Sequence, residues 1–161
     1  MDYNNPDKKT RFLQQTAMWM VMHPHNNNSS EANVLYPWWN AETIRMCQKI
    51  RAYTEKVTHK FVIVNDGGGV VDCLSEYPRM NSTQQFIQYC NNNNISSVVY
   101  CGFSHGVCII SEKQFGMKNM QDVHPHIKLY LKHDLTCVGP AGGVSAWKSA
   151  DELTRLYAEI I

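Results

Sequence analysis

The chain has 161 residues, of which 43% are hydrophobic and 18% are charged, and its formal net charge is +1. This length and composition are typical of a single folded domain, residues 1–161, and exclude a disordered chain. Lysine and arginine are scattered rather than clustered, so we expect neither nucleic-acid binding nor membrane binding.

Six cysteines occur without a CxxC pair, at Cys47, Cys73, Cys90, Cys101, Cys108 and Cys137. A domain of this size does not need disulfides, and the first residues are polar rather than typical of a signal peptide. No apolar run approaches the length of a membrane-spanning helix. We therefore expect reduced thiols in a cytoplasmic protein.

Residues 1–14 are interpreted as a polar lead-in. The first buried strand is expected at Ala17–Met22, because this apolar run is short, continuous and ended by His23-Pro24-His25. A run of this kind is typical of a strand that is buried on both faces of a parallel sheet. A polar loop is expected from there to about Trp39.

A helix is predicted over residues 41–57, because Asn40 is a suitable N-cap and apolar residues recur at a spacing of three. Lys60–Asn65 has the pattern of a second buried strand. It stops at Asp66, which is followed by three glycines, and a turn is the simplest interpretation of that segment. A hairpin-like excursion is predicted for Val70–Met80.

Ser82 and Gln85 have the spacing of a capping box, which predicts a helix that ends at the asparagine run. The third strand is expected at Ile95–Cys101. A helix is then predicted from His105 to about Met117, with Cys108 in its first turn.

Ile127–Lys132 alternates in polarity and predicts a fourth, less buried strand. Ser149 and Glu152 form a second possible capping box, followed by an amphipathic helix to the end of the chain. The alternation of strands and helices predicts an α/β fold, a three-layer sandwich with a mostly parallel, Rossmann-like sheet.

The segment around Cys108 is the most informative one. A thiol in the first turn of a helix lies among free backbone N–H groups, and such settings make a thiol more readily ionised and more reactive. The alternative is a buried, unreactive cysteine. The sequence leaves both interpretations open.

Ligands of open parallel sheets bind beyond the carboxyl ends of the strands. Polar and reactive residues follow each of the four expected strands: His23 and His25, then Asn65 and Asp66, then Ser104, His105 and Cys108, and finally His133 and Asp134. We expect them to converge at one edge of the sheet.

The residues Gly102-Phe103-Ser104-His105-Gly106-Val107-Cys108-Ile109 resemble a Gly-Val-Ala-Thr-x-x-Cys-Val motif. This motif is characteristic of the isochorismatase-like cysteine hydrolase superfamily, which includes nicotinamidases and N-carbamoyl amidases. The resemblance extends from Thr16 to the last helix. It implies a three-layer isochorismatase-like fold, a homo-oligomer, and Cys108 as the nucleophile.

The family's other two catalytic residues are not evident. Its aspartate at the end of strand one would fall at Met22 or His23, and its lysine between strands two and three has at most Arg79 as a counterpart. Arginine stays protonated and is a poor proton shuttle. Either His23 or His25 replaces the base, or the hydrolase chemistry is lost.

Two functions therefore remain. The first is a divergent cysteine hydrolase of a small amide, imide or vinyl-ether-like substrate, and the second is an inactive relative that binds a metabolite or a protein partner. In the first, backbone N–H groups from Gly106 to Cys108 stabilise the oxyanion. The residues expected at such a site are Cys108, His23 and His25 for catalysis, and Ser104, His105, Gly106, Asp66 and Trp39 for substrate binding.

We expect no cofactor and no metal. The two His-Pro-His elements, at residues 23–25 and 124–126, are expected at opposite edges of the sheet, because one follows a strand and the other precedes one. Trp38 and Trp39 suit core or interface packing better than a substrate wall.

Overall fold

The computed structural model describes residues 6–25, 35, 37–64, 69–139 and 144–161. In this part of the chain five strands form one all-parallel sheet in the order β2-β1-β3-β4-β5. Their bounds are β1 Met18–Met22, β2 His59–Ile63, β3 Ser97–Phe103, β4 Lys128–Cys137 and β5 Glu159–Ile160. The predicted α/β class is confirmed, and β3 is the central strand.

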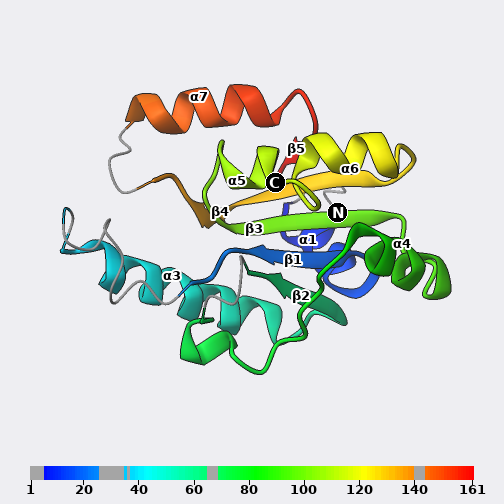
Figure 1. The fold of residues 1–161 in the computed structure, drawn as a ribbon, viewed down its shortest axis with the longest axis horizontal. Helices are drawn as coiled ribbons and strands as arrows, with labels where there is room; N and C mark the ends of the chain where they lie inside the picture. Colours follow the sequence, from blue (N-terminus) through cyan, green and yellow to red (C-terminus); the bar gives the residue numbers. More distant parts are fainter. Residues whose placement is uncertain (1–5, 26–34, 36, 65–68, 140–143) are drawn as a thin grey trace.

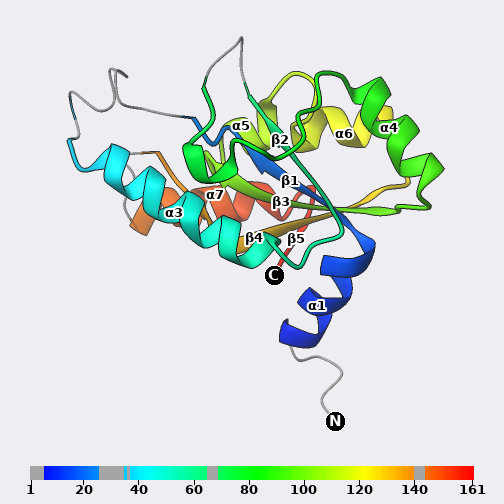
Figure 2. The same cartoon turned by 90° about the horizontal axis from the view of Figure 1, so that it is seen from below.

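Helices cover both faces of the sheet (Figures 1 and 2). Two of them, α1 and α3, pack on one face, and α4, α5 and α6 pack on the other, while α7 lies beyond β4 beside α5. No helix among the described residues is long and apolar enough to cross a membrane. The helix bounds are α1 Pro6–Thr16, α3 Trp39–Thr54, α4 Thr83–Asn92, α5 Cys108–Ser111, α6 Met117–Val123 and α7 Val144–Thr154, with a short 3₁₀ helix, η1, at Asp72–Leu74.

Alternate residues of β1 contribute to two separate hydrophobic cores. Met20 packs in a cluster with residues of α4, α5 and α6, whereas Trp19 and Val21 pack in a cluster with residues of α1 and α3. Side chains of a strand alternate between the two faces of a sheet. Because both faces of this sheet are covered, β1 is apolar at every position, which explains its continuous apolar run.

Residues 6–16 form α1, although the sequence predicts only a polar lead-in over residues 1–14. Leu13 of this helix is buried in the core, and its carbonyl oxygen accepts a hydrogen bond from the Trp19 indole N–H at 3.0 Å. The next helix begins earlier than expected. Asn40 lies inside α3 rather than capping it, and the N-cap position is held by Trp38, which makes no side-chain capping hydrogen bond.

Only one of the two hydrogen bonds of the capping box predicted at Ser82 is formed. The Ser82 hydroxyl accepts a hydrogen bond from the Gln85 N–H at 3.2 Å, but the Gln85 side chain accepts from the N–H of Asn81 instead of Ser82. The hairpin expected at Val70–Met80 is wrong. That segment contains η1 and makes only isolated bridges at its ends, from Val70 to His25 and from Arg79 to Val62.

The single helix expected from His105 to Met117 is also wrong, because it is divided into α5 and α6. The Glu112 carboxylate accepts hydrogen bonds from the N–H groups of Gln114 and Phe115 and so closes a turn directly after α5. At Gly116 an added Cβ would lie 2.6 Å from the Ile110 carbonyl oxygen. The chain therefore turns tightly here before α6 begins.

The C-terminal segment differs most from the prediction. Ser149 and Glu152 lie inside α7 and do not cap a helix, and the last residues form the edge strand β5. Ile161, directly after this strand, also bonds to β4: its N–H donates to the Leu131 carbonyl at 2.8 Å, and its carbonyl accepts from the His133 N–H at 3.0 Å. Strand β4 extends to Cys137, so His133 lies within it and not after it.

Candidate functional site

The turn after β3 places Cys108 at the carboxyl edge of the sheet. The Ser104 carbonyl oxygen accepts hydrogen bonds from the N–H groups of Val107 at 3.1 Å and Ile109 at 3.4 Å. These bonds close the turn, and Cys108 is the first residue of α5. The carboxyl ends of the strands meet on the left of Figure 1, where α3 and α7 also begin.

Two glycines with positive φ make this turn possible. Gly102, at φ 100°, lies against β1, and an added Cβ would be 2.3 Å from the Met22 carbonyl oxygen. Gly106, at φ 80°, lies against α7, and an added Cβ would be 2.6 Å from the Ala150 Cβ. Only glycine satisfies both the backbone conformation and the lack of space.

Cys108 differs from most other thiols of the chain in its exposure. All six cysteines are free, and only Cys73 and Cys108 are partly exposed. Burial raises the pKa of Cys90 to about 12 and of Cys137 to about 11, and it also raises the pKa of Cys47, Cys101 and Cys73. A reagent in solvent therefore reaches Cys108 more easily than the four buried thiols.

His23 and His25 lie at the end of β1, the strand next to β3. Their imidazole rings stack with centroids 5.0 Å apart, and the His23 N–H donates to the Ile63 carbonyl at 2.8 Å. Burial, and secondarily the charge of His23, lower the pKa of His25. A neutral imidazole near pH 7 is able to accept a proton. Its role as a base toward Cys108 stays a prediction.

The positions that correspond to the family's acid and lysine carry different chemistry. Met22 ends β1 and its side chain is fully buried in the core. Arg79 is exposed and its backbone bridges to Val62 of β2. Neither residue supplies the proton transfer that the resemblance implies for these positions.

The remaining predicted binding residues have mixed placements. Trp39 is buried and meets Phe103, the last residue of β3, edge-on with centroids 6.2 Å apart, whereas Trp38 is 53% exposed. Ser104 and Gly106 are half-buried in the turn. Asp66 lies outside the described residues. A substrate contact for Trp39, Ser104 and Gly106 stays a prediction.

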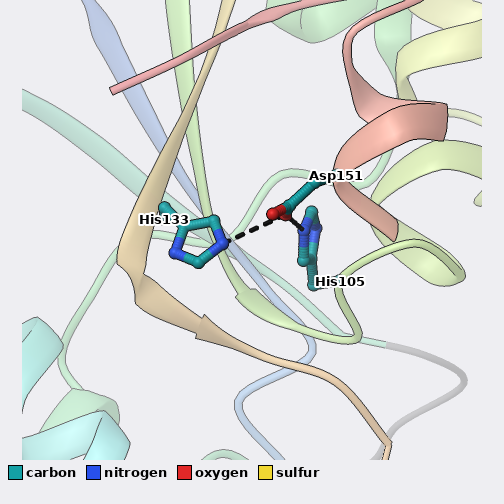
Figure 3. A group of neighbouring side chains, drawn as sticks. All are labelled: His105, His133 and Asp151. Atoms are coloured by element: carbon teal, nitrogen blue, oxygen red, sulfur yellow. Dashed lines mark hydrogen bonds and ion pairs between the residues drawn. The ribbon is translucent and has the colours of Figure 1, made fainter. Parts of the chain in front are cut away.

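The structure also joins His105 and His133, both of which were expected at this edge, to a third polar side chain that was not predicted there, Asp151 (Figure 3). One oxygen of Asp151, Oδ1, lies 2.7 Å from His105 Nε2 and 3.0 Å from His133 Nε2. The His105 side chain is fully buried, so a contact with substrate would require it to move; that role stays a prediction. Trp147, one helical turn before Asp151, packs against both imidazole rings at 5.4 and 4.9 Å.

The charges in this cluster depend on one another. Burial lowers the pKa of His105, and the hydrogen bond and charge of Asp151 oppose that shift. For Asp151, burial acts to raise the pKa, but the hydrogen bonds and charges of His105 and His133 outweigh it, and the pKa is lowered. Asp151 therefore stays ionised between two imidazoles.

An irregularity in β4 brings His133 to this place. Tyr100 of β3 pairs with Leu131, but Gly102, only two residues further along β3, pairs with Thr136. The extra residues of β4 form a bulge that contains His133. The Thr136 hydroxyl donates to the His133 carbonyl at 2.8 Å and so fixes the bulge. Bulges of this kind often redirect a side chain near a functional site.

Two further predictions concern Asp134 and His124, which lie on or near β4. Asp134 was expected after strand four, but it lies inside β4, is exposed, and pairs with Lys132. His124 precedes β4 at the amino edge, as predicted, and so lies at the end of the sheet opposite to His23.

The chain was compared with known proteins. No protein-family model and no curated protein matches it. An isochorismatase-like hydrolase from Alkaliphilus metalliredigens has a TM-score of 0.60 at 13% identity, covering 91% of this chain and 93% of that one. The nicotinamidase PncA of Bacillus subtilis has a TM-score of 0.58 at 10% identity, covering 90% and 98%. YcaC of Escherichia coli, described as an octameric hydrolase of unknown specificity, has a TM-score of 0.55 at 10% identity, covering 91% and 74%.

These matches extend over nearly the whole chain at low identity. The protein therefore has the isochorismatase-like hydrolase fold, which confirms the resemblance drawn from the Gly102–Ile109 motif.

Proposed function

We propose that the protein is a divergent cysteine hydrolase in which Cys108 attacks a small amide, imide or vinyl-ether-like substrate. The observation that carries this proposal is the place of Cys108. It is a partly exposed thiol on the first residue of a helical turn that directly follows the central strand. Ligand sites of open parallel sheets lie at this carboxyl edge. The fold neighbours described as hydrolases, one of them a nicotinamidase, support an amide as the first substrate class to test.

The proposed reaction on an amide has two steps. An imidazole accepts the thiol proton, the thiolate attacks the carbonyl carbon, and the amine leaves with that proton. Water then hydrolyses the thioester and releases the acid and the free thiol. The developing oxyanion needs N–H donors, and the Val107 N–H is already used by Ser104. We assign this role to the N–H groups of Gly106 and Cys108.

His25 is the better of the two candidate bases. Its lowered pKa keeps the ring neutral near pH 7, and a neutral ring is required to accept the thiol proton. His23 is buried and stacks on His25, which fixes the orientation of the pair. Met22 stands where the family has its acid and cannot transfer a proton. In this proposal the two histidines perform that transfer instead.

A second function is favoured by that same Met22. This chain has no acid at the end of β1, and Arg79 stands where the family's lysine is expected. A relative that lacks both groups would keep the fold but lose the reaction. Such a protein would bind a metabolite or a protein partner at the carboxyl edge. We also propose that the protein is a homo-oligomer, because one fold neighbour is described as octameric. Light scattering on the purified protein measures its oligomeric state directly.

The experiment that separates the two functions uses the wild type, Cys108→Ala and a matched control, Cys73→Ala, which changes the other partly exposed thiol. Nicotinamide, an N-carbamoyl amine and a cyclic imide are tested for hydrolysis and, by thermal shift, for binding. Turnover in the wild type and Cys73→Ala that is lost in Cys108→Ala supports the hydrolase. Binding without turnover supports the second function, and turnover that persists in Cys108→Ala contradicts the proposed nucleophile.

A further inference from the structure

We propose that His105, His133 and Asp151 form a binding site for one divalent transition-metal ion of the zinc type. The three side chains come from three separate elements: the turn after β3, the bulge of β4, and α7 (Figure 3). One ligand atom from each side chain lies within 4.8 Å of the other two. This site goes beyond the hydrolase proposal and does not depend on Cys108 being a nucleophile.

The geometry is close to that of a coordinated ion. Both Nε2 atoms point to the same oxygen, Asp151 Oδ1, at 2.7 and 3.0 Å. Bonds of about 2.0–2.2 Å to a tetrahedral zinc ion place neighbouring ligand atoms about 3.4 Å apart. The two nitrogen–oxygen distances therefore need to lengthen by only about half an ångström to admit the ion. Each neutral ring then coordinates through Nε2 and carries its one proton on Nδ1, and only a charged ring releases a proton as the ion binds.

The surroundings hold the ligands in place before an ion binds. The Trp147 ring packs against both imidazoles, and the two imidazoles meet each other edge-to-face at 5.7 Å. Two hydrogen bonds fix the backbone of His133. Its N–H donates to the Ile161 carbonyl, and its carbonyl accepts from the Thr136 hydroxyl.

The orientation of the His105 ring presents its Nε2 to the cluster. Among the described residues its Nδ1 is buried and has no hydrogen-bond partner. The hydrogen bond of this buried ring is thus made through Nε2, the atom that faces the cluster. A pair of imidazole nitrogens and one carboxylate oxygen is a donor set that zinc and related divalent metals prefer over magnesium or calcium.

The site is open on one side. The His105 side chain is fully buried, while the side chains of His133 and Asp151 are 39% and 22% exposed. Three protein ligands with an accessible fourth position leave room for a water molecule. A bound ion would also join β4 and α7 to the turn that carries Cys108, since His105 lies in that turn.

The test uses the purified full chain after treatment with a chelator. Cobalt(II) is the probe, because cobalt in a site with nitrogen and oxygen ligands gives visible absorption bands, while thiolate ligands add a separate near-ultraviolet band. Zinc(II) is then titrated by competition against a chromophoric chelator. The variants are Asp151→Asn and His133→Gln, with His126→Gln as the matched control, because His126 is exposed and lies before β4. Circular dichroism in the absence of metal checks the fold of each variant.

We expect the wild type and His126→Gln to bind one cobalt or zinc ion per chain without the thiolate band. Asp151→Asn and His133→Gln should bind the metal at least about tenfold more weakly than the wild type. Loss of an outer-sphere partner already lowers metal affinity by about tenfold or more, and these two residues are direct ligands in the proposal. Asp151→Asn retains the shape of the side chain, so it decides the result if His133→Gln does not fold. Equal affinity in wild type and Asp151→Asn, a cobalt spectrum dominated by thiolate, or no binding at millimolar metal would overturn the proposal and leave a hydrogen-bonded cluster.

Discussion

His105 Nε2 lies 2.7 Å from Asp151 Oδ1, and this contact joins the turn after β3 to α7 across 46 positions of the sequence. Next to it, Gly106 packs against Ala150 of the same helix. The turn that carries Cys108 is therefore held in place by α7. Changes in this helix should alter both stability and the reactivity of the thiol.

Asp151→Ala tests that support. The change leaves the buried His105 imidazole without the partner of its Nε2, and we expect it to lower the free energy of unfolding by about 1–3 kcal/mol. Urea denaturation in the presence of a chelator measures the effect without metal. Asp134→Ala is the control, because Asp134 is an exposed residue whose ion pair with Lys132 is worth at most about 1 kcal/mol. Equal losses in the two variants would show that the contact with His105 is not a support.

Gly106→Ala tests the fit of the turn against α7. The new Cβ would lie 2.6 Å from Ala150 Cβ in a backbone conformation with φ 80°. We expect a loss of about 1–3 kcal/mol in the free energy of unfolding. Gly139→Ala is the matched control, because nothing lies within 4 Å of a Cβ added there. If both variants unfold at the same urea concentration, the described packing of the turn is wrong.

His25 gives an expected pH dependence. Burial and His23 hold the pKa of His25 below its usual value of 6.5 in the folded state, so the unfolded chain binds a proton more readily. Its contribution to stability is therefore present above about pH 6.5 and is lost as the pH falls below that value. We expect the unfolding free energy to fall between pH 7.5 and pH 5.5, and to fall less steeply in His25→Asn.

The matched variant for this pH series is His126→Asn, which changes an exposed histidine at the other edge of the sheet. It should reproduce the wild-type slope between the same two pH values. A wild-type slope in His25→Asn as well would mean that His25 is not held neutral by its surroundings.

Much of the scaffold could be predicted from the sequence, because its strands are covered on both faces. The runs at β1 and β3 are apolar at nearly every position, and their order with the helices defines a parallel sheet. The Gly102–Ile109 motif also placed Cys108 correctly after the central strand. These signals are local, and each can be read within about ten residues.

The features that could not be predicted depend on distant partners. Strand β5 has only two residues and exists because β4 offers free backbone groups at its edge. The meeting of His133 with Asp151 depends on the bulge in β4, which the alternation from Ile127 to Lys132 does not reveal. Asp151 itself belongs to no motif, and its role depends on the folded positions of His105 and His133.

The central claim is that Cys108 is a reactive nucleophile at the open end of the sheet. The most direct measurement is the rate at which iodoacetamide modifies each of the six thiols at pH 7, followed by peptide mass spectrometry, with free cysteine as the reference. We predict that Cys108 is modified first, faster than free cysteine and well ahead of the four buried thiols. Modification of Cys108 no faster than free cysteine would contradict the account and leave the fold without its proposed chemistry.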